Sequence, residues 1–207
     1  MILPAMQSDL GWSYAQSGWI NTANALGYIA GAALTFALID RIGERPLFNA
    51  GLVVASISLL MCGFGDDILS LTVWRVLAGI AGAPVFIAGG AMAASLFPHD
   101  ARKNALAIAG YFGGAGLGML LAGAVLPGFF ATFGPAAWPD AWIGLGLASL
   151  AVTPVALWAS GQIHPPHPGR GCGGALPMRR MVPALTGYGL FACGYIVYLT
   201  FIVAWAG

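Results

Sequence analysis

The sequence predicts an all-α polytopic membrane protein with six transmembrane helices. Six strongly apolar stretches fill most of the 207 residues, and each reaches the roughly 20 residues that a helix needs to cross a bilayer. With 59% hydrophobic and only 7% charged residues, the chain has too little polar surface for a water-soluble domain of this size. The Lys and Arg residues between the stretches fall in alternate loops, as expected for a chain that crosses the membrane repeatedly.

Each predicted span is apolar along its whole length, and charged residues occur at the boundaries between spans. The spans are residues 18–39, 47–65, 68–97, 104–133, 141–162 and 182–207. Arg75, in the third, is the only charged residue inside any of them.

The distribution of basic residues predicts the orientation of the chain in the membrane. Short loops rich in Lys and Arg stay in the cytoplasm. The loops after the first, third and fifth spans hold Arg41, Arg45, Arg102, Lys103, Arg170, Arg179 and Arg180. The other segments hold Asp9, Asp66, Asp67 and Asp140, with no Lys or Arg. We therefore expect a multi-pass protein of the plasma (inner) membrane, with the three basic loops in the cytoplasm and both chain ends outside.

The two ends of the sequence resemble cut edges. Residues 1–6 are apolar and lack the basic leader of a signal peptide, and a polar turn is expected over residues 7–13. This segment therefore looks like the exit of a missing helix. The sixth span stops without a following loop, so a fragment of a longer protein is expected. The Pro- and Gly-rich segment at residues 163–181 is predicted to be a cytoplasmic linker.

The composition argues against several other functions. The basic residues form no patch interleaved with aromatic residues, so we expect no nucleic-acid partner. Cys62, Cys172 and Cys193 have unrelated spacings and are interpreted as small buried hydrophobic residues. His164 and His167 lie near Cys172, but the intervening prolines disfavour convergent ligands, so neither a metal nor a cofactor is expected. No span contains paired acids, a His cluster, or a nucleophile with a base, so an enzyme is not expected.

Small residues recur at helical spacing on two spans. Gly27 and Gly31 share one face of the first span, and Gly110, Gly114 and Gly118 share one face of the fourth. Such stripes let another backbone approach closely. We interpret them as helix-packing surfaces, which in a transporter can also be sliding surfaces.

Polar and aromatic residues line one face of two spans. Asn21, Asn24 and Tyr28 share a face of the first span, and Tyr188, Tyr195 and Tyr198 share a face of the sixth. Polar side chains at membrane depth normally face the bundle interior or a wet cavity. We predict that these six residues line a cavity. Interhelical hydrogen bonding is the alternative for the three residues of the first span, and packing is the alternative for the three tyrosines of the sixth.

Arg75 is an intramembrane charge, which is costly and by default functional. One interpretation is that its guanidinium extends to the outer interface. The other is that it stays between helices and meets a carboxylate or backbone carbonyl groups.

Several motifs resemble those of the major facilitator superfamily. After the first span the chain reads Asp40-Arg41-Ile42-Gly43-Glu44-Arg45, which is similar to the Asp-Arg-x-Gly-x-Arg loop between the second and third helices of those transporters. Arg75-x-x-x-Gly79 is similar to the signature of their fourth helix. The segments 3–11, 22–28, 113–118 and 194–201 more narrowly resemble the YbfB/YjiJ family of that superfamily.

This resemblance implies a major facilitator-type helical bundle in which the six spans are family helices two to seven. Residues 1–162 would then be most of the N-terminal bundle, and residues 182–207 the first helix of the C-terminal bundle. It also implies secondary active transport of a small solute by alternating access, with a coupling proton as a possible partner besides the lipid bilayer. Asp40, Arg41, Gly43 and Arg45 would serve the cytoplasmic gate. The glycine-rich fourth span is loosely similar to an antiporter motif, which makes efflux an option. The alternative is a truncated, transport-inactive fragment of such a transporter.

Overall fold

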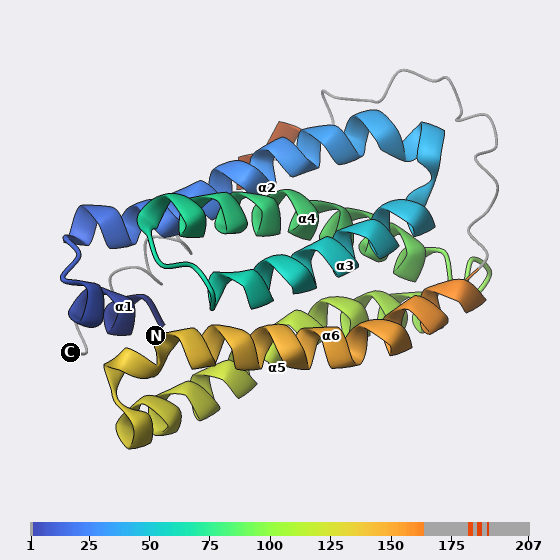
Figure 1. Ribbon diagram of the computed structural model, residues 1–207. Coiled ribbons are helices and arrows are strands. Elements are labelled where there is room, and N and C mark those ends of the chain that lie inside the picture. The colour runs from blue at the N-terminus through green and yellow to red at the C-terminus, as the bar shows by residue number, and fades with distance from the viewer. Residues whose placement is uncertain (1, 164–181, 184–185, 188–189, 191–207) are drawn as a thin grey trace. The chain divides into compact units, whose positions relative to one another are not determined.

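The computed structural model describes residues 2–163, 182–183, 186–187 and 190, and every described segment with regular structure is helical. The chain divides into two compact units, Met1–Pro168 and Gly169–Gly207. The first unit contains all the helices discussed below (Figure 1). In order they are α1 Ile2–Leu10, α2 Tyr14–Ile42, α3 Glu44–Cys62, α4 Ile68–Ala94, α5 Ala101–Phe133, the 3₁₀ turn η1 Pro135–Ala137 and α6 Trp138–Gln162.

The predicted fold class is confirmed. Five helices, α2 to α6, are long and apolar enough to span a membrane, and they coincide with the first five predicted spans. Most of them extend beyond the apolar stretch because polar residues at a helix end can still complete backbone hydrogen bonds. The third is shorter than predicted and ends at Ala94. The sixth predicted span lies almost wholly outside the described residues.

The helix boundaries follow from local capping chemistry. Ser13 and Gln16 form a capping box at the start of α2, and Asp67 and Asp100 cap α4 and α5 by accepting hydrogen bonds from backbone N–H groups. Gly43 alone separates α2 from α3, with φ +92°. A residue with a side chain would be strained in that conformation.

Helices α2 and α4 pack backbone to backbone. A Cβ added at Gly27 would collide with the carbonyl oxygen of Val76, and one added at Gly31 would lie 2.7 Å from Cα of Ile80. From the other side, a Cβ at Gly79 would lie 2.8 Å from the backbone nitrogen of Tyr28. Glycines on both helices therefore allow an approach that no other residue would permit.

Helices α3 and α6 are joined by buried hydroxyl groups. The Ser56 hydroxyl lies 2.7 Å from that of Ser149 and 3.1 Å from that of Thr153. Near the other end of the pair, Ser160 donates to the side-chain carbonyl of Asn49 at 2.8 Å. These contacts satisfy polar groups that hydrocarbon cannot solvate.

Helix α1 packs against the start of α6. Met6 is fully buried in a cluster with Trp138 and Trp142, and Trp138 donates its indole N–H to Asp9 at 2.9 Å. Residues 7–10, predicted to be part of a turn, instead continue α1. The turn begins at Gly11, whose φ of +63° ends the helix.

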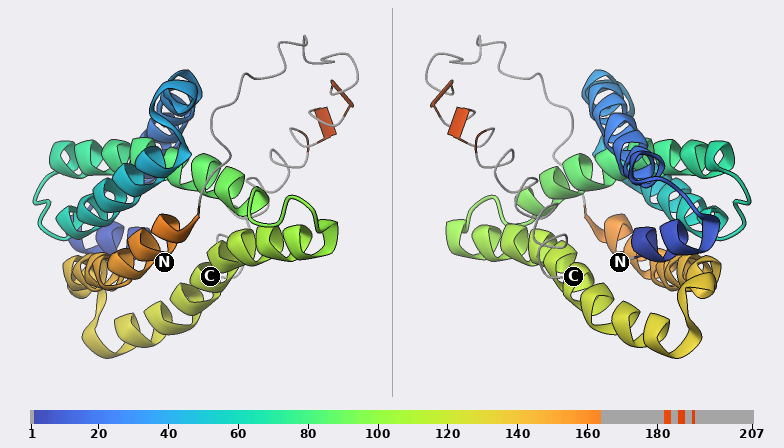
Figure 2. Two further views of the ribbon diagram at one scale, coloured as in Figure 1. Left: turned by 90° about the vertical axis from the view of Figure 1, so that its right-hand side faces the viewer. Right: turned by 90° about the vertical axis from the view of Figure 1, so that its left-hand side faces the viewer.

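Helix α5 is the loosest member of this unit. It contains no buried residue, whereas half of the most apolar window of α4 is buried. From the turn at Gly134, α5 and α6 diverge (Figure 2). Apolar cavities lie along α5 as a result.

Candidate functional site

The intramembrane Arg75 lies at the α2–α4 contact. Its guanidinium donates to the side-chain oxygen of Asn21 at 3.3 Å, and its backbone carbonyl accepts a hydrogen bond from the Asn24 amide at 2.8 Å. Both asparagines come from the predicted polar face of α2. The structure therefore brings three of the predicted site residues together in one polar cluster.

An aromatic residue from α6 completes the surroundings of Arg75. The guanidinium carbon lies 5.1 Å from the centre of the Trp142 ring, within the range of a cation–π interaction. The Nε atom of Arg75 and the indole nitrogen of Trp142 are both buried without a hydrogen-bond partner. Among residues 2–163, no carboxylate lies within ion-pair distance of Arg75. The charge is thus held by dipoles and a π face.

Asn24 makes the interhelical hydrogen bond that the sequence offered as the alternative to cavity lining. Its amide is directed to the α4 backbone, and it lines none of the cavities described below. Asn21 is exposed, and its side-chain oxygen accepts the hydrogen bond from the Arg75 guanidinium.

Tyr28, the third residue of that face, borders a cavity of about 340 Å³ between α2, α3, α4 and α5. The lining contains no charged residue, and its aromatic members are Tyr28, Phe86, Tyr111 and Phe112. The Phe86 and Phe112 rings are 4.9 Å apart.

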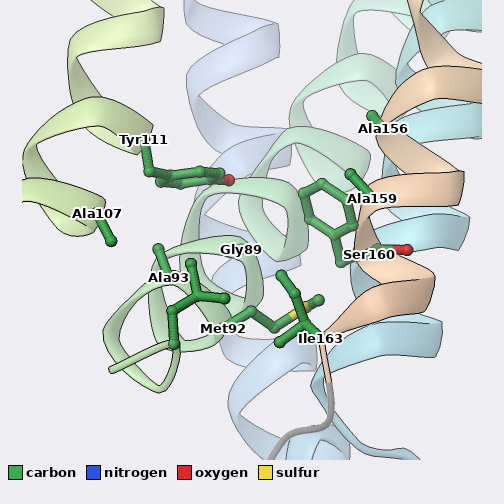
Figure 3. Close-up of a pocket in the computed structure, with 11 residues that line it drawn as sticks. Gly89, Met92, Ala93, Ala107, Tyr111, Ala156, Ala159, Ser160 and Ile163 are labelled. Carbon is green, nitrogen blue, oxygen red and sulfur yellow. The ribbon is translucent and has the colours of Figure 1, made fainter. Parts of the chain in front are cut away.

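A second cavity, of about 300 Å³, is shown in Figure 3. It lies between α3, α4, α5 and α6 and is lined almost entirely by alanine and larger apolar side chains. Tyr111 borders this cavity as well, so a single side chain belongs to both. Ser160 also lies at its edge, but its hydroxyl is used by Asn49 and the Leu157 carbonyl.

A third apolar cavity, of about 470 Å³, separates α5 from α6 and includes Gly118 and Asp140 in its lining. None of the three cavities contains a cation in its lining. The first two, whose linings also contain no carboxylate, suit neutral, apolar groups.

Sequence reasoning did not single out Tyr111. Its hydroxyl donates to the backbone carbonyl of Val85 at 2.5 Å. The available signal was a lone tyrosine beside the glycine stripe of the fourth span, which is too common a pattern to identify a site.

The two predicted glycine stripes have different surroundings. Gly27 and Gly31 contact the α4 backbone, as described above. Gly110, Gly114 and Gly118 have nothing within 4 Å of an added Cβ. Within the described part of the chain, the stripe on α5 faces open space.

The predicted gate motif lies at the junction of α2 and α3. Asp40 and Arg41 are exposed in the last turn of α2, and Gly43 forms the turn itself. The Arg45 guanidinium lies 3.1 Å from the position of a Cβ at Gly161, near the end of α6, where the helix dipole favours a cation. Asp40 forms no ion pair with any cation of the described segments.

The next basic loop contains a carboxyl group whose pKa is shifted by a local hydrogen bond. Asp100 accepts a hydrogen bond from the backbone N–H of Lys103 at 3.0 Å, and this bond lowers the pKa of the carboxyl group. The Lys103 ammonium group lies 3.3 Å from the same carboxylate.

Other predicted residues lie outside the described segments. They are Tyr188, Tyr195, Tyr198, His164, His167, Cys172 and Cys193. Cys62 is buried in α3. In the described ranges, no group of three or more His, Cys, Asp or Glu side chains could hold a metal ion.

The chain is similar to transporters over its whole length. The family model described as "Uncharacterised MFS-type transporter YbfB" matches residues 1–207. The multidrug export protein EmrB of Haemophilus influenzae is 29% identical over 105 residues, which are 51% of this chain and 21% of that protein. A probable multidrug-efflux transporter of Mycobacterium tuberculosis is 29% identical over 161 residues, 77% of this chain and 33% of that protein.

A third relative is the fatty acid resistance protein FarB of Neisseria gonorrhoeae, 29% identical over 106 residues, 51% of this chain and 21% of that protein. The chain therefore spans about a fifth to a third of the length of these three relatives. With five apolar helices in the described residues and a family match over residues 1–207, the chain belongs to the YbfB-type family of the major facilitator superfamily.

Proposed function

We propose that this protein takes part in secondary active transport of a small solute across the plasma membrane by alternating access. The observation that carries the proposal is the α2–α4 contact, where glycines permit backbone approach around the intramembrane Arg75. A charge without a carboxylate partner among residues 2–163 is costly at membrane depth. A role in ion coupling or in the change between access states would explain the presence of this charge.

In this proposal residues 1–162 are most of one transporter bundle, and residues 182–207 begin a second bundle after a cytoplasmic linker at 163–181. The solute would bind near the membrane midplane. Tyr28 borders a cavity whose lining carries no charge, which favours a neutral or amphipathic solute. Two relatives are named for multidrug export and multidrug efflux, and these names support the efflux direction. A proton is the coupling ion in this proposal.

The proposed orientation places the loops after α2, α4 and α6 in the cytoplasm. A single cysteine introduced as His99→Cys, in a background without native cysteines, should react with a membrane-impermeant maleimide only from the cytoplasmic side. Asp66→Cys, which is equally exposed in the preceding loop, is the matched control and should react only from outside. The opposite pattern at both positions would invert the topology.

The transport proposal is tested by counterflow of candidate solutes into liposomes. A version of the protein extended to the length of its relatives should show solute-dependent counterflow. Failure across a panel of neutral, cationic and anionic solutes would contradict the proposal.

The second candidate is a transport-inactive membrane fragment, favoured by the small share of each relative that the chain covers. If it holds, the 207-residue chain alone inserts into liposomes but supports no counterflow. Counterflow by this chain alone would rule that candidate out.

A further inference from the structure

Helix α5 contacts α4 around Tyr111, and near its other end it packs against the cluster that joins α1 to α6. Although 33 residues long, it has no buried residue. The hydrogen bond from Tyr111 to the Val85 carbonyl joins α5 to α4. The contact between α5 and α4 therefore depends on the surroundings of Tyr111.

Two adjacent glycines of α4 receive two adjacent aromatic residues of α5. A Cβ added at Gly89 would collide with the Tyr111 hydroxyl and lie 2.5 Å from Cζ of its ring. A Cβ added at Gly90 would lie 2.8 Å from Cζ of Phe112. Each ring thus occupies a notch that only glycine leaves open.

The hydroxyl of Tyr111 makes its contact in the same notch. Val85 is one turn before Gly89 on α4, so its carbonyl group lies where the ring crosses the helix. The phenol bonds that carbonyl at 2.5 Å. Phe112 continues the contact through its ring, 4.9 Å from that of Phe86.

Tyr111 also stands between two cavities. It is the only residue common to the linings of the 300 Å³ cavity and the 340 Å³ cavity. Figure 3 shows its ring extending from α5 toward α4, across the upper edge of the 300 Å³ cavity. Movement of this one side chain would change the boundary that separates them.

We propose that Tyr111 and Phe112 of α5, seated on Gly89 and Gly90 of α4, form a releasable latch. In the closed state the Tyr111–Val85 hydrogen bond holds α5 against α4 and keeps the two cavities apart. In the open state the phenol leaves the Gly89 notch, α5 separates from α4, and the cavities merge. This device goes beyond the proposed transport function and can be tested without a transported solute.

The test measures access to a buried position beside the latch. Ala93→Cys lies on α4 in the lining of the 300 Å³ cavity, where Ala93 is 5% exposed. The full chain, with its three native cysteines replaced by serine, is placed in lipid nanodiscs and treated with N-ethylmaleimide. Tyr111→Phe, which removes only the hydroxyl group, and Gly89→Ala, which fills the notch, should each raise the alkylation rate at least threefold.

Two controls separate latch release from general loosening. Tyr14→Phe removes the hydroxyl of a tyrosine that is 87% exposed and should leave the rate unchanged. Ser58→Cys, at a position 1% exposed on α3, should remain unreactive in every variant. Because Tyr111→Phe and Gly89→Ala act on one contact, the double variant should react less than the product of the two single effects predicts.

An unchanged Ala93→Cys rate in both latch variants would overturn the proposal. So would an equal rise at Ser58→Cys, since the effect would then be a general loss of structure.

Discussion

The side-chain amide of Asn24 donates to the backbone carbonyl of Arg75, 2.8 Å away, and so ties α2 to α4 at the residue that carries the intramembrane charge. This carbonyl group belongs to the α4 backbone. The hydrogen bond therefore indicates contact between two helices and not a role of Asn24 in ligand binding.

Asn24→Ala should therefore lower the free energy of unfolding by about 1 kcal/mol, in line with other hydrogen bonds between membrane helices. The measurement is reversible unfolding in mixed micelles. Ser70→Ala serves as a control, because its side chain makes no interhelical hydrogen bond in the described structure. A variant with unchanged stability but weakened solute binding would support the cavity-lining interpretation of Asn24 instead.

Gly27→Ala and Gly114→Ala form a matched pair. Both gain the same intrinsic helix propensity, about 1 kcal/mol, but only the Cβ at residue 27 meets a neighbouring backbone. Gly27→Ala should be less stable than Gly114→Ala by roughly 1–3 kcal/mol, the usual cost of overpacking. Equal unfolding free energies for the two variants would show that α2 and α4 are not in close backbone contact.

Arg75→Met should separate stability from function. The substitution keeps an apolar stem and removes the charge. It also removes the 3.3 Å hydrogen bond to Asn21 and the cation–π contact with Trp142. We expect the free energy of unfolding to change by less than about 1.5 kcal/mol. In a version of the protein extended to the length of its relatives, we expect the substitution to abolish transport. Full transport by Arg75→Met would reduce the arginine to a packing role.

The start of α5 should depend on pH through Asp100. Its pKa lies below the ordinary value of 3.8 because the folded state provides the Lys103 N–H as a donor. The stabilisation is therefore fully present above pH 3.8 and is lost as the pH falls through the lowered pKa. Hydrogen exchange at the Lys103 amide should accelerate over that range beyond its intrinsic pH dependence. Asp100→Asn retains an acceptor and should remove this additional dependence; a persistent one would exclude Asp100 as its cause.

The features that could be predicted from the sequence are those that depend on a single helix. Span length and apolar composition identify five helices of the described unit, and spacing places Gly27 and Gly31 on one face of the first of them. The sequence could not identify the residues across each contact, because Asn24 meets Arg75 and Tyr111 meets Gly89 only after three helices, α2, α4 and α5, have packed. The stripe at Gly110, Gly114 and Gly118 shows this limit. Its periodicity defines one face of the helix but does not identify which helix packs against that face.

The gate motif offers a prediction that distinguishes control of access from solute binding. Asp40 is exposed at the end of α2 and lines none of the three cavities described above. We expect it to bias one access state through contacts at the cytoplasmic face. A bias of about 1–2 kcal/mol changes state populations several-fold without altering contacts to the solute.

The most direct test of alternating access measures both the solute dissociation constant and the transport rate of the Asp40→Asn variant. Both are measured in a version of the protein extended to the length of its relatives. The account predicts a transport rate at least several-fold slower, with equilibrium affinity within a few-fold of the unmodified protein. Loss of binding in Asp40→Asn, or transport at the unmodified rate, would contradict it.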